Sequence, residues 1–291
     1  MEIFGIPAAS LVQSFINGLA LGWIYILIAM GLSLVFGTMR ILQFAHGEVY
    51  MLGAYAVYDF VVLHRLPFLV AMPLCMATGL VLGLILERFF FRPLGGEFLP
   101  TIMIALGVMI VLQAIVTVGF GVTPKSVPSF APHAVEVLGL RLGSDRLIAV
   151  AVSIALILLL YFFLKRTKLG LALTAAAQHR EASLLMGINP THMSLTAMAV
   201  GSAMASVAGG LMGSIFPLNP VMGGTALMKG LIIIILGGMG SLPGVLVGGL
   251  ILGFIDGVAP VVSGPAMAAI APLFIVTMIL VLRPQGLFGH E

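Results

Sequence analysis

The sequence predicts an all-α integral membrane protein, a polytopic bundle of about eight or nine transmembrane helices with broken or re-entrant segments in both halves. Of its 291 residues, 61% are hydrophobic and 8% charged, whereas soluble domains are roughly 45–50% apolar and about 25% charged. The few charges leave long uncharged stretches, such as residues 98–124 and 257–282, and each can hold a span of about 20 apolar residues. We therefore treat residues 1–291 as a single membrane domain.

The charge balance and the cysteine count exclude several classes of function. The chain has 13 Lys and Arg residues against 10 Asp and Glu, a net charge of +3, so it offers no extended basic surface for a nucleic-acid backbone. The single cysteine, Cys75, permits no intramolecular disulfide and makes a cysteine-based metal site unexpected. No basic segment precedes the first apolar run, so we expect that run to be retained as a helix rather than removed as a signal peptide.

Apolar stretches in the first half predict five spans. They cover about residues 9–30, 47–63, 67–86, 99–121 and 147–164. Residues 122–146 lie between the last two spans and contain three prolines and several charges. This composition predicts an external loop that is too short to form a domain of its own.

Basic residues predict the orientation in the membrane, because short basic clusters face the cytoplasm. The clusters are Arg88 with Arg92, and Lys165, Arg166 and Lys168 with Arg180. Two predicted spans separate the clusters, which places both on the same side. Counting spans from them puts the N-terminus outside, and Arg283 after the last span puts the C-terminus in the cytoplasm.

The second half is predicted to contain two spans with a broken region between them. The spans cover residues 190–211 and 266–282. Prolines and glycines divide residues 212–265 into pieces shorter than a full span, and such pieces are tolerated only against protein or a watery cavity. The number of spans in this region, and whether its charges Lys229 and Asp256 interact, are left open by the sequence.

A similar interruption lies in the first half, at residues 31–55. It is cut by Gly37, Arg40, His46, Gly47 and Glu48. Glycine-interrupted segments in both halves point to a transporter site between internal repeats. A charge at the bilayer centre costs about 2.5–3.5 kcal/mol, so Glu48 should lie at an interface, in a cavity, or beside Arg40 or His46. The alternative is a cytoplasmic helix end whose polar side chains cap free N–H groups.

Residues 165–190 differ from the spans because they are too polar to cross the membrane. Within them, residues 173–186 predict a short amphipathic helix, and Gly187 is a favourable helix stop. Such a helix either lies on the lipid headgroups or docks into a groove of a soluble partner. The physical pattern alone does not decide between the two.

Five motifs run in order along nearly the whole chain. They are Asn17-Gly18 with Gly22-Trp23-Ile24-Tyr25, FAHGEVYMLGAY at 44–55, RTKLGLALTAAAQHREASLLMGIN at 166–189, GGMGSLPGVLVGGLILG at 237–253 and LRPQGLFG at 282–289. In combination they resemble the branched-chain amino-acid permease family of ABC importers, and most closely its LivH-type subunit. One departure is Gln43, where many relatives have Asn.

The resemblance implies the permease subunit of an ATP-driven importer that works by alternating access. Its partners would be a second, related permease in a heterodimer, two cytoplasmic ATPase subunits and an external solute-binding protein, in the inner membrane of a bacterial cell. Branched-chain amino acids lead as the solute, and urea, short amides and aromatic acids belong to the same family architecture. The chain lacks the glycine-rich phosphate-binding loop with its Lys, so it would hold no cofactor, and the partner ATPases would bind ATP and Mg²⁺.

The resemblance also assigns two sets of site residues. The segment 166–189 would be a coupling helix that contacts one ATPase. Its contact residues would be Ala176, Gln178, His179, Glu181, Ala182, Met186 and Gly187. The translocation pathway would follow the broken helices, at Gln43, Phe44, His46, Gly47, Glu48, Gly237, Gly238 and Ser241.

Two alternatives come from other classes of protein. A stand-alone secondary transporter or channel for a small neutral or zwitterionic solute shares the composition and the broken helices, but it has no need of a docking helix at 166–189. An intramembrane hydrolase would use a buried serine, or His46 with Glu48. It is disfavoured because the sequence lacks a Gly-x-Ser-x-Gly nucleophile turn.

Overall fold

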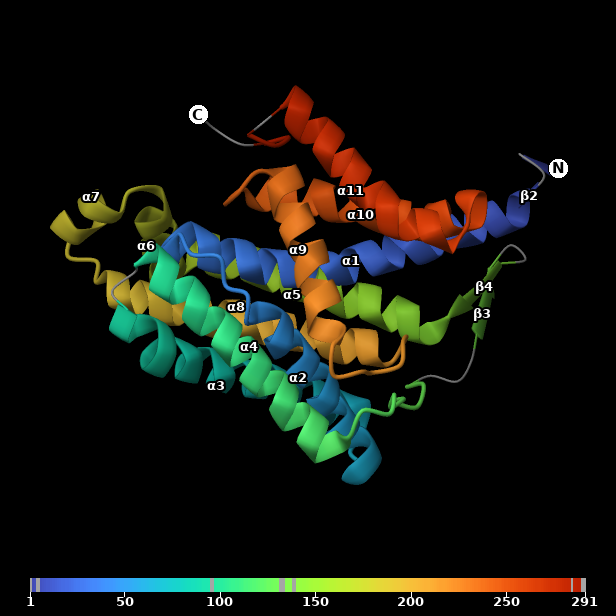
Figure 1. Ribbon diagram of the computed structural model, residues 1–291, viewed down its shortest axis with the longest axis horizontal. Coiled ribbons are helices and arrows are strands. Elements are labelled where there is room, and N and C mark those ends of the chain that lie inside the picture. The colour runs from blue at the N-terminus through green and yellow to red at the C-terminus, as the bar shows by residue number, and fades with distance from the viewer. Residues whose placement is uncertain are drawn as a thin grey trace.

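The computed structural model describes residues 2–3, 6–94, 97–130, 134–137, 140–283 and 285–288. Pro284 and Gly289 of the last sequence motif lie outside these residues. The described chain is a bundle of helices with two small hairpins, β1–β2 and β3–β4, as Figure 1 shows.

The elements follow one another as a series of long helices joined by short ones. The first part contains β1 (Glu2–Ile3), β2 (Ile6–Pro7), α1 (Ala8–Met39), α2 (His46–Tyr58), the π-helix η1 (Asp59–Leu63), α3 (Phe68–Ile85), the π-helix η2 (Leu86–Phe91), the 3-10 helix η3 (Arg92–Leu94) and α4 (Phe98–Phe120). The second part contains β3 (Ala134–Val137), β4 (Leu140–Gly143), α5 (Ser144–Arg166), α6 (Lys168–Gln178), α7 (Arg180–Leu185), α8 (Pro190–Gly213), α9 (Met222–Gly237), α10 (Leu242–Ser263) and α11 (Pro265–Leu282).

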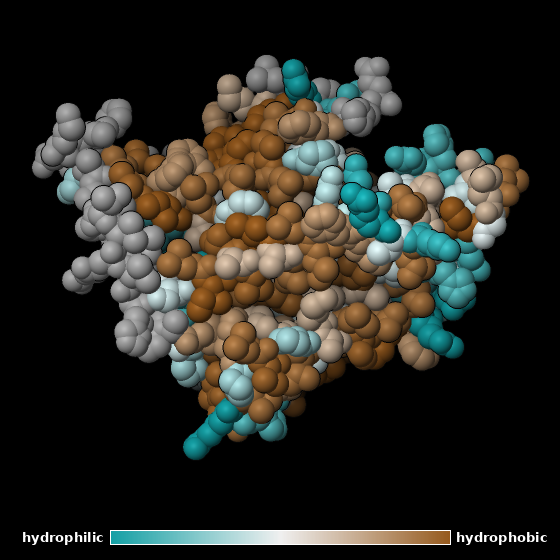
Figure 2. Space-filling view, turned by 180° about the vertical axis from the view of Figure 1, so that it is seen from behind, coloured by the Kyte–Doolittle hydropathy of each residue, from teal (hydrophilic) through white to brown (hydrophobic). Residues whose placement is uncertain are grey.

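Six stretches of the described chain are long and apolar enough to cross a membrane. They are Ser10–Met39, Phe68–Leu94, Phe98–Phe120, Ser144–Arg166, Pro190–Gly213 and Leu242–Val262, with two shorter apolar helices at Met222–Gly237 and Ile270–Ile279. The chain is therefore a multi-pass membrane protein with about the number of helices that the sequence predicts. Figure 2 shows an apolar surface across the middle of the bundle and hydrophilic residues gathered at the end where α6 and α7 lie.

Helices α1 and α8 form the core of the bundle. In both helices, 83% of the most hydrophobic stretch of 18 residues is buried inside the bundle. The two helices are in contact, since Gly31 of α1 touches the backbone of Gly201 of α8. Helix α1 ends beside α6, and α8 starts directly after α7. The two core helices therefore run antiparallel, as Figure 1 shows.

Small residues let the outer helices approach this core closely. Gly18 of α1 lies against Gly253 and Gly257 of α10, and Gly79 of α3 lies against Ser202 and Ser206 of α8. A Cβ at Gly18 or Gly79 would collide with the opposite helix. Such seams are typical of helix association in lipid, where helices adhere by van der Waals contact rather than by a hydrophobic driving force.

The two halves of the chain repeat the same arrangement with opposite direction. A long buried helix (α1 or α8) is followed by a break and a shorter helix (α2 or α9). The next helix, α3 or α10, then packs along the core helix of the other half. The antiparallel core helices make this an inverted repeat.

The second half departs from its sequence-based interpretation at α10. Residues 242–263 form one continuous helix that can span the membrane, so the prediction of short pieces throughout 212–265 is wrong for this part. Only 33% of the most hydrophobic stretch of α10 is buried. This helix therefore lies at the surface of the bundle, where the sequence predicted contact with protein or a watery cavity. The physical reason is that Pro243 stands in the first turn, where proline favours a helix. Gly37 likewise lies inside α1 and does not interrupt it.

A polar triad joins three helices inside the apolar bundle. Lys229 of α9 forms an ion pair with Asp256 of α10. Lys229 Nζ also donates to the Tyr25 hydroxyl of α1 (2.7 Å), and that hydroxyl donates to Asp256 Oδ2 (2.9 Å). The Asp256 side chain is only 7% exposed, so each charged group depends on the other for compensation. The interaction that the sequence left open therefore fastens α9 to α10 and α1.

The contact between α2 and α8 yields a first test of the packing. A Cβ on Gly53 would collide with the Ser206 backbone, and one on Gly209 with the Tyr50 carbonyl. We expect Gly53→Ala or Gly209→Ala to separate the helices and to lower the free energy of unfolding by about 1–3 kcal/mol, measured by thermal unfolding in detergent. Gly107→Ala is the matched control, since this helical glycine has open space around it. An equal loss in the control would contradict the packing account.

The triad yields a second test. Replacing Lys229 with Met leaves Asp256 buried without a counter-ion, which should cost about 3 kcal/mol of stability. Tyr25→Phe removes one hydroxyl and should cost about 1 kcal/mol. The exposed Lys168 provides the control substitution Lys168→Met, for which we expect no change. Thermal unfolding of the four proteins should follow this order, and a Lys229→Met protein as stable as wild type would contradict the assigned role of the pair.

Candidate functional site

The break after α1 allows α2 to begin inside the bundle. Arg40 caps α1 in the left-handed conformation (φ 54°), with its N–H bonded to the Phe36 carbonyl at 2.7 Å. The chain then turns back through residues 40–45, and α2 starts with His46, Gly47 and Glu48 all buried. The interruption expected from the sequence is confirmed at this place.

The break after α8 has the same result for α9. The Asn219 side-chain oxygen accepts a hydrogen bond from the Val221 N–H (3.1 Å), and the Asn219 carbonyl accepts one from Met222 (3.2 Å). Backbone hydrogen bonds between Lys125 and Leu218 (3.0 and 2.8 Å) hold this turn against the connection after α4. Helix α9 starts at Met222, which is also buried.

The first turns of α2 and α9 meet at two glycines. Gly47 and Gly223 lie backbone to backbone, and neither position has room for a Cβ. We call this contact, with Glu48 beside it, the α2–α9 junction. Both carboxylate oxygens of Glu48 lie 2.8 Å from the place that a Gly223 Cβ would take, so the acid stands at the start of α9 as well as of α2.

The charge of Glu48 is only partly compensated at the junction. A helix N-terminus carries a partial positive charge of roughly half an elementary charge, and two such ends converge on the carboxylate of Glu48. The Gln113 side chain of α4 donates to Glu48 Oε1 at 2.9 Å, whereas Oε2 is buried without a hydrogen-bond partner. The junction therefore keeps one free acceptor next to two helix ends.

The geometry decides between the expectations for Glu48. The acid is buried beside a partner, which is Gln113 rather than Arg40 or His46, and Arg40 is exposed at the end of α1. The alternative of a capping role also fails, because the N-cap of α2 is Ala45 and has no side-chain cap hydrogen bond. A single sequence gives two weak signals for these partners: Gln113 is an amide in a long apolar stretch, and Gly223 lies in the broken region.

The other residues predicted at the first break surround the turn. Gln43 is 1% exposed, and neither of its amide atoms has a hydrogen-bond partner. The His46 ring is fully buried against Gly31 of α1, and Phe44 is half-buried. This short loop therefore holds an unusual density of buried polar groups.

The residues predicted at the second break lie elsewhere. Gly237, Gly238 and Ser241 form the turn between α9 and α10, where the Ser241 hydroxyl accepts a hydrogen bond from Gly244 N–H at 3.2 Å. This turn is at the opposite end of the 16-residue helix α9 from Gly223, a distance of about 20 Å. The structure therefore does not bring the two predicted groups of pathway residues together.

The segment 166–189 forms two helices rather than one. His179 is extended (φ −141°, ψ 94°) and separates α6 from α7, so the single helix predicted over residues 173–186 is wrong. The Thr167 hydroxyl caps α6 by accepting from Gly170 N–H at 3.0 Å. Gly187 ends α7 in the left-handed region (φ 79°), as its position predicts.

Most of the predicted contact residues of this segment are exposed. Ala176 is buried in α6 and points away from solvent. The exposed ones are Gln178, His179, Glu181, Ala182, Met186 and Gly187. They are accompanied by Leu185, which the sequence analysis did not single out, and Leu185 and Met186 are 89% and 81% exposed. The tip of α7 is therefore an apolar projection that the described part of the chain leaves uncovered.

Comparison with known proteins places these features in a family. Residues 14–282 match the family model of the permease component of branched-chain amino acid transport systems. The chain is 31% identical to the high-affinity branched-chain amino acid transport permease BraD of Pseudomonas aeruginosa, over 96% of this chain and 95% of BraD. It is 29% identical to LivH of Escherichia coli K12, over 96% and 95% of the two chains.

A more distant relative is LivM of Escherichia coli K12, at 27% identity over 91% of this chain and 67% of LivM. No solved structure gives a significant match. The match to the family model covers more than half of the chain. The chain therefore belongs to the family of permease components of branched-chain amino acid transport systems.

Proposed function

We propose that this chain is the membrane-spanning permease subunit of an ABC importer for branched-chain amino acids. The observation that carries the proposal is the family match over residues 14–282, together with relatives named as high-affinity branched-chain amino acid permeases. The chain is a transport subunit in this proposal, and the ATP and Mg²⁺ that drive transport are bound by partner ATPases.

The proposed solute pathway passes the α2–α9 junction. An amino acid carries one ammonium and one carboxylate, and the junction offers a complement to the ammonium. Glu48 has a free acceptor for this group. An aromatic acid without an ammonium group would leave Glu48 unpaired, so this chemistry supports an amino acid as the solute.

In this proposal the remaining predicted pathway residues lie at the two ends of the solute pathway. Gln43, Phe44, His46 and Gly47 stand around the start of α2. The turn with Gly237, Gly238 and Ser241 would mark the point where the route leaves the far end of α9. Alternating access then requires the two inverted halves to move relative to each other, which the binding of ATP drives only if ATP binds one state more tightly.

The proposed contact with the ATPase is the segment 166–189. Its helix α7 projects from one end of the bundle (Figure 1) with Leu184, Leu185 and Met186 exposed. An uncovered apolar tip suits insertion into a groove of a soluble partner. Gln178, His179 and Glu181 would supply the polar rim of this contact.

The orientation and the remaining partners follow from this assignment. Arg92 and Arg180 of the two basic clusters line one cavity, so both clusters lie at the end that carries α7, and we assign that end to the cytoplasm. The N-terminus is then outside, and α11 leads the C-terminus to the cytoplasmic side of a bacterial inner membrane. A related permease completes a heterodimer, for which LivM-like chains are candidates, and an external solute-binding protein delivers the amino acid.

The coupling assignment predicts the effect of a charge at the tip of α7. Met186→Arg should abolish retention of the ATPase when the permease is purified after co-expression with the ATPase subunits of its system. Burying an unpaired charge in an interface costs about 2–5 kcal/mol, which corresponds to at least a tenfold loss of affinity. The measurement is the amount of ATPase that co-purifies with the tagged permease.

The control is Val122→Arg, at a residue that is 72% exposed just after α4, at the other end of the bundle. It should retain the ATPase. If no ATPase is retained by the wild type, or if Met186→Arg retains it while remaining folded, the coupling assignment is wrong and a stand-alone transporter becomes the leading explanation.

The pathway assignment predicts a loss of transport without loss of assembly. Glu48→Gln removes the charge that would meet the ammonium group, and we expect uptake of radiolabelled leucine to fall at least about tenfold in cells that lack other leucine importers. Retention of the ATPase should not change. Glu97→Gln, at an exposed acid before α4, is the matched control, and wild-type uptake by Glu48→Gln would refute the role of Glu48.

A further inference from the structure

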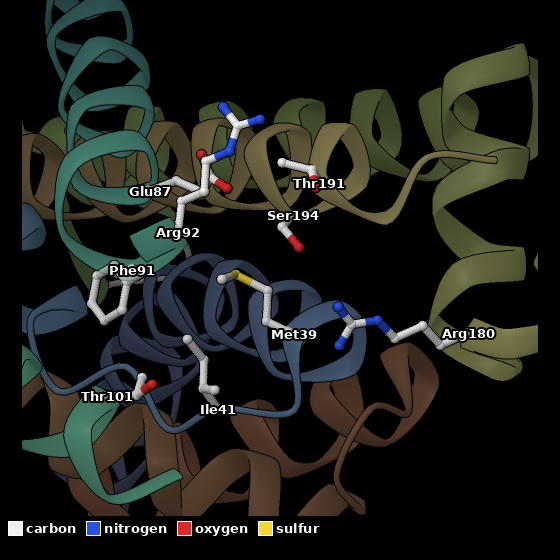
Figure 3. A pocket seen from close by; sticks show the side chains of 9 residues that line it. All are labelled: Met39, Ile41, Glu87, Phe91, Arg92, Thr101, Arg180, Thr191 and Ser194. Carbon is white, nitrogen blue, oxygen red and sulfur yellow. The ribbon is translucent and has the colours of Figure 1, made fainter. Parts of the chain in front are cut away.

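A polar cavity lies at the end of the bundle that carries α7. It has a volume of about 120 Å³, where about 10–15 Å³ on the same measure suffices for one water molecule. It is lined by Met39, Ile41, Glu87, Phe91, Arg92, Thr101, Arg180, Thr191 and Ser194, and Figure 3 shows it from close by. None of these residues belongs to the α2–α9 junction, so the cavity is a separate place in the molecule.

An unpartnered acid forms one wall of this cavity. Glu87 of η2 is 1% exposed, and its Oε2 is buried without a hydrogen-bond partner. Arg88, Arg92 and His192 are its charged neighbours, but none of them forms an ion pair with it among the described residues. Burying a carboxylate without a hydrogen-bonded partner costs free energy. The presence of such an acid at this position therefore needs a physical explanation.

A cation faces it from the other wall. Arg180, the first residue of α7, extends across the opening from the side opposite Glu87 in Figure 3. Thr191 and Ser194 of α8 lie between these two walls. Met39, Ile41 and Phe91 supply an apolar floor. Glu87, with Arg92 beside it, therefore stands on one wall and Arg180 on the other, with hydroxyl groups between them.

We propose that this cavity binds a free α-amino acid as a zwitterion. The ammonium group would pair with Glu87, and the carboxylate would accept a two-pronged hydrogen bond from the Arg180 guanidinium. The hydroxyl groups of Thr191 and Ser194 would donate to the same carboxylate, and the side chain would lie on the apolar floor. Once the ligand is present, the charge of Glu87 is paired with the ammonium group.

The bound amino acid would connect α7 to the bundle. Arg180 belongs to α7, whereas Glu87 belongs to η2 and the hydroxyl groups to α8. A ligand held by both sides therefore restrains α7. The binding itself does not depend on the proposed function, but its consequence does: if α7 is the coupling segment, accumulated amino acid at this end would oppose further import.

Binding to the purified full-length permease tests the inference in the absence of ATPase and solute-binding protein. The probes are L-leucine, isovaleric acid, which lacks the ammonium group, and isoamylamine, which lacks the carboxylate. We expect saturable binding of radiolabelled leucine to the permease in lipid nanodiscs, with each analogue at least tenfold weaker as a competitor. Glu87→Gln and Arg180→Gln should each weaken leucine binding at least tenfold.

The matched control is Arg166→Gln. Arg166 is exposed at the end of α5, lies outside the cavity lining and is not among the charged neighbours of Glu87, so leucine binding should not change. Glu87→Gln should also raise the melting temperature, because it removes an unpaired buried charge, and this readout distinguishes a lost ligand group from a damaged fold. Arg180 is exposed, so its substitution keeps the test valid if Glu87→Gln fails to fold.

Several results would overturn the proposal. They are the absence of saturable leucine binding to the wild type, binding of isovaleric acid as tightly as leucine, or unchanged binding in Glu87→Gln and Arg180→Gln. Loss of binding in Glu48→Gln alone would move the site to the α2–α9 junction. Failure of ATPase retention or of leucine uptake would contradict the proposed function and leave these binding results unaffected, so the two failures are distinguishable.

Discussion

Close contact between helix backbones is the constraint on which the rest of this structure depends. Lipid tails are as apolar as the side chains that face them, so helices in a membrane associate by van der Waals contact where small residues permit it. The seams of Gly18 with Gly253 and of Gly79 with Ser206 place an outer helix directly on each core helix. Because α1 and α8 are covered in this way, the bundle remains stable although two helices, α2 and α9, begin in its interior.

Three acids inside the bundle show three different solutions to the cost of a buried charge. Asp256 has a full counter-ion in Lys229 and a hydroxyl partner in Tyr25. Glu48 has only the Gln113 amide and the partial charges of two helix ends. Glu87 has no hydrogen-bonded partner for its buried oxygen. The charge is compensated best in Asp256, which fastens helices together, and less in Glu48 beside the helix break and in Glu87 beside the cavity. This order is expected where stability is given up for binding.

The sequence predicts the spans of this protein well because apolar length is a local property. Most predicted spans agree with the observed helices within a few residues, and the first break falls where Arg40 and Gly47 indicate it. Prolines were less reliable guides: Pro243 starts α10, and Pro73 and Pro260 lie inside helices without ending them.

The partners across the bundle could not be predicted, because they depend on positions far apart in the chain. Gly47 and Gly223 are 176 positions apart and meet only once both breaks have formed, and Gln113 reaches Glu48 from a helix that belongs to neither repeat. The extended conformation of His179, which divides the segment 166–189, likewise has no local glycine or proline to signal it.

Helix α8 also connects the segment 166–189 to the interior of the bundle. It begins at Pro190, only four residues after the end of α7, and is capped by Asn189. It contains no proline beyond its first turn and extends about 36 Å to the turn that Lys125 holds in place before α9. One continuous helix therefore connects the end of the bundle that carries α7 with the turn before α9, so a tilt of the first would reach the second through the backbone of a single element.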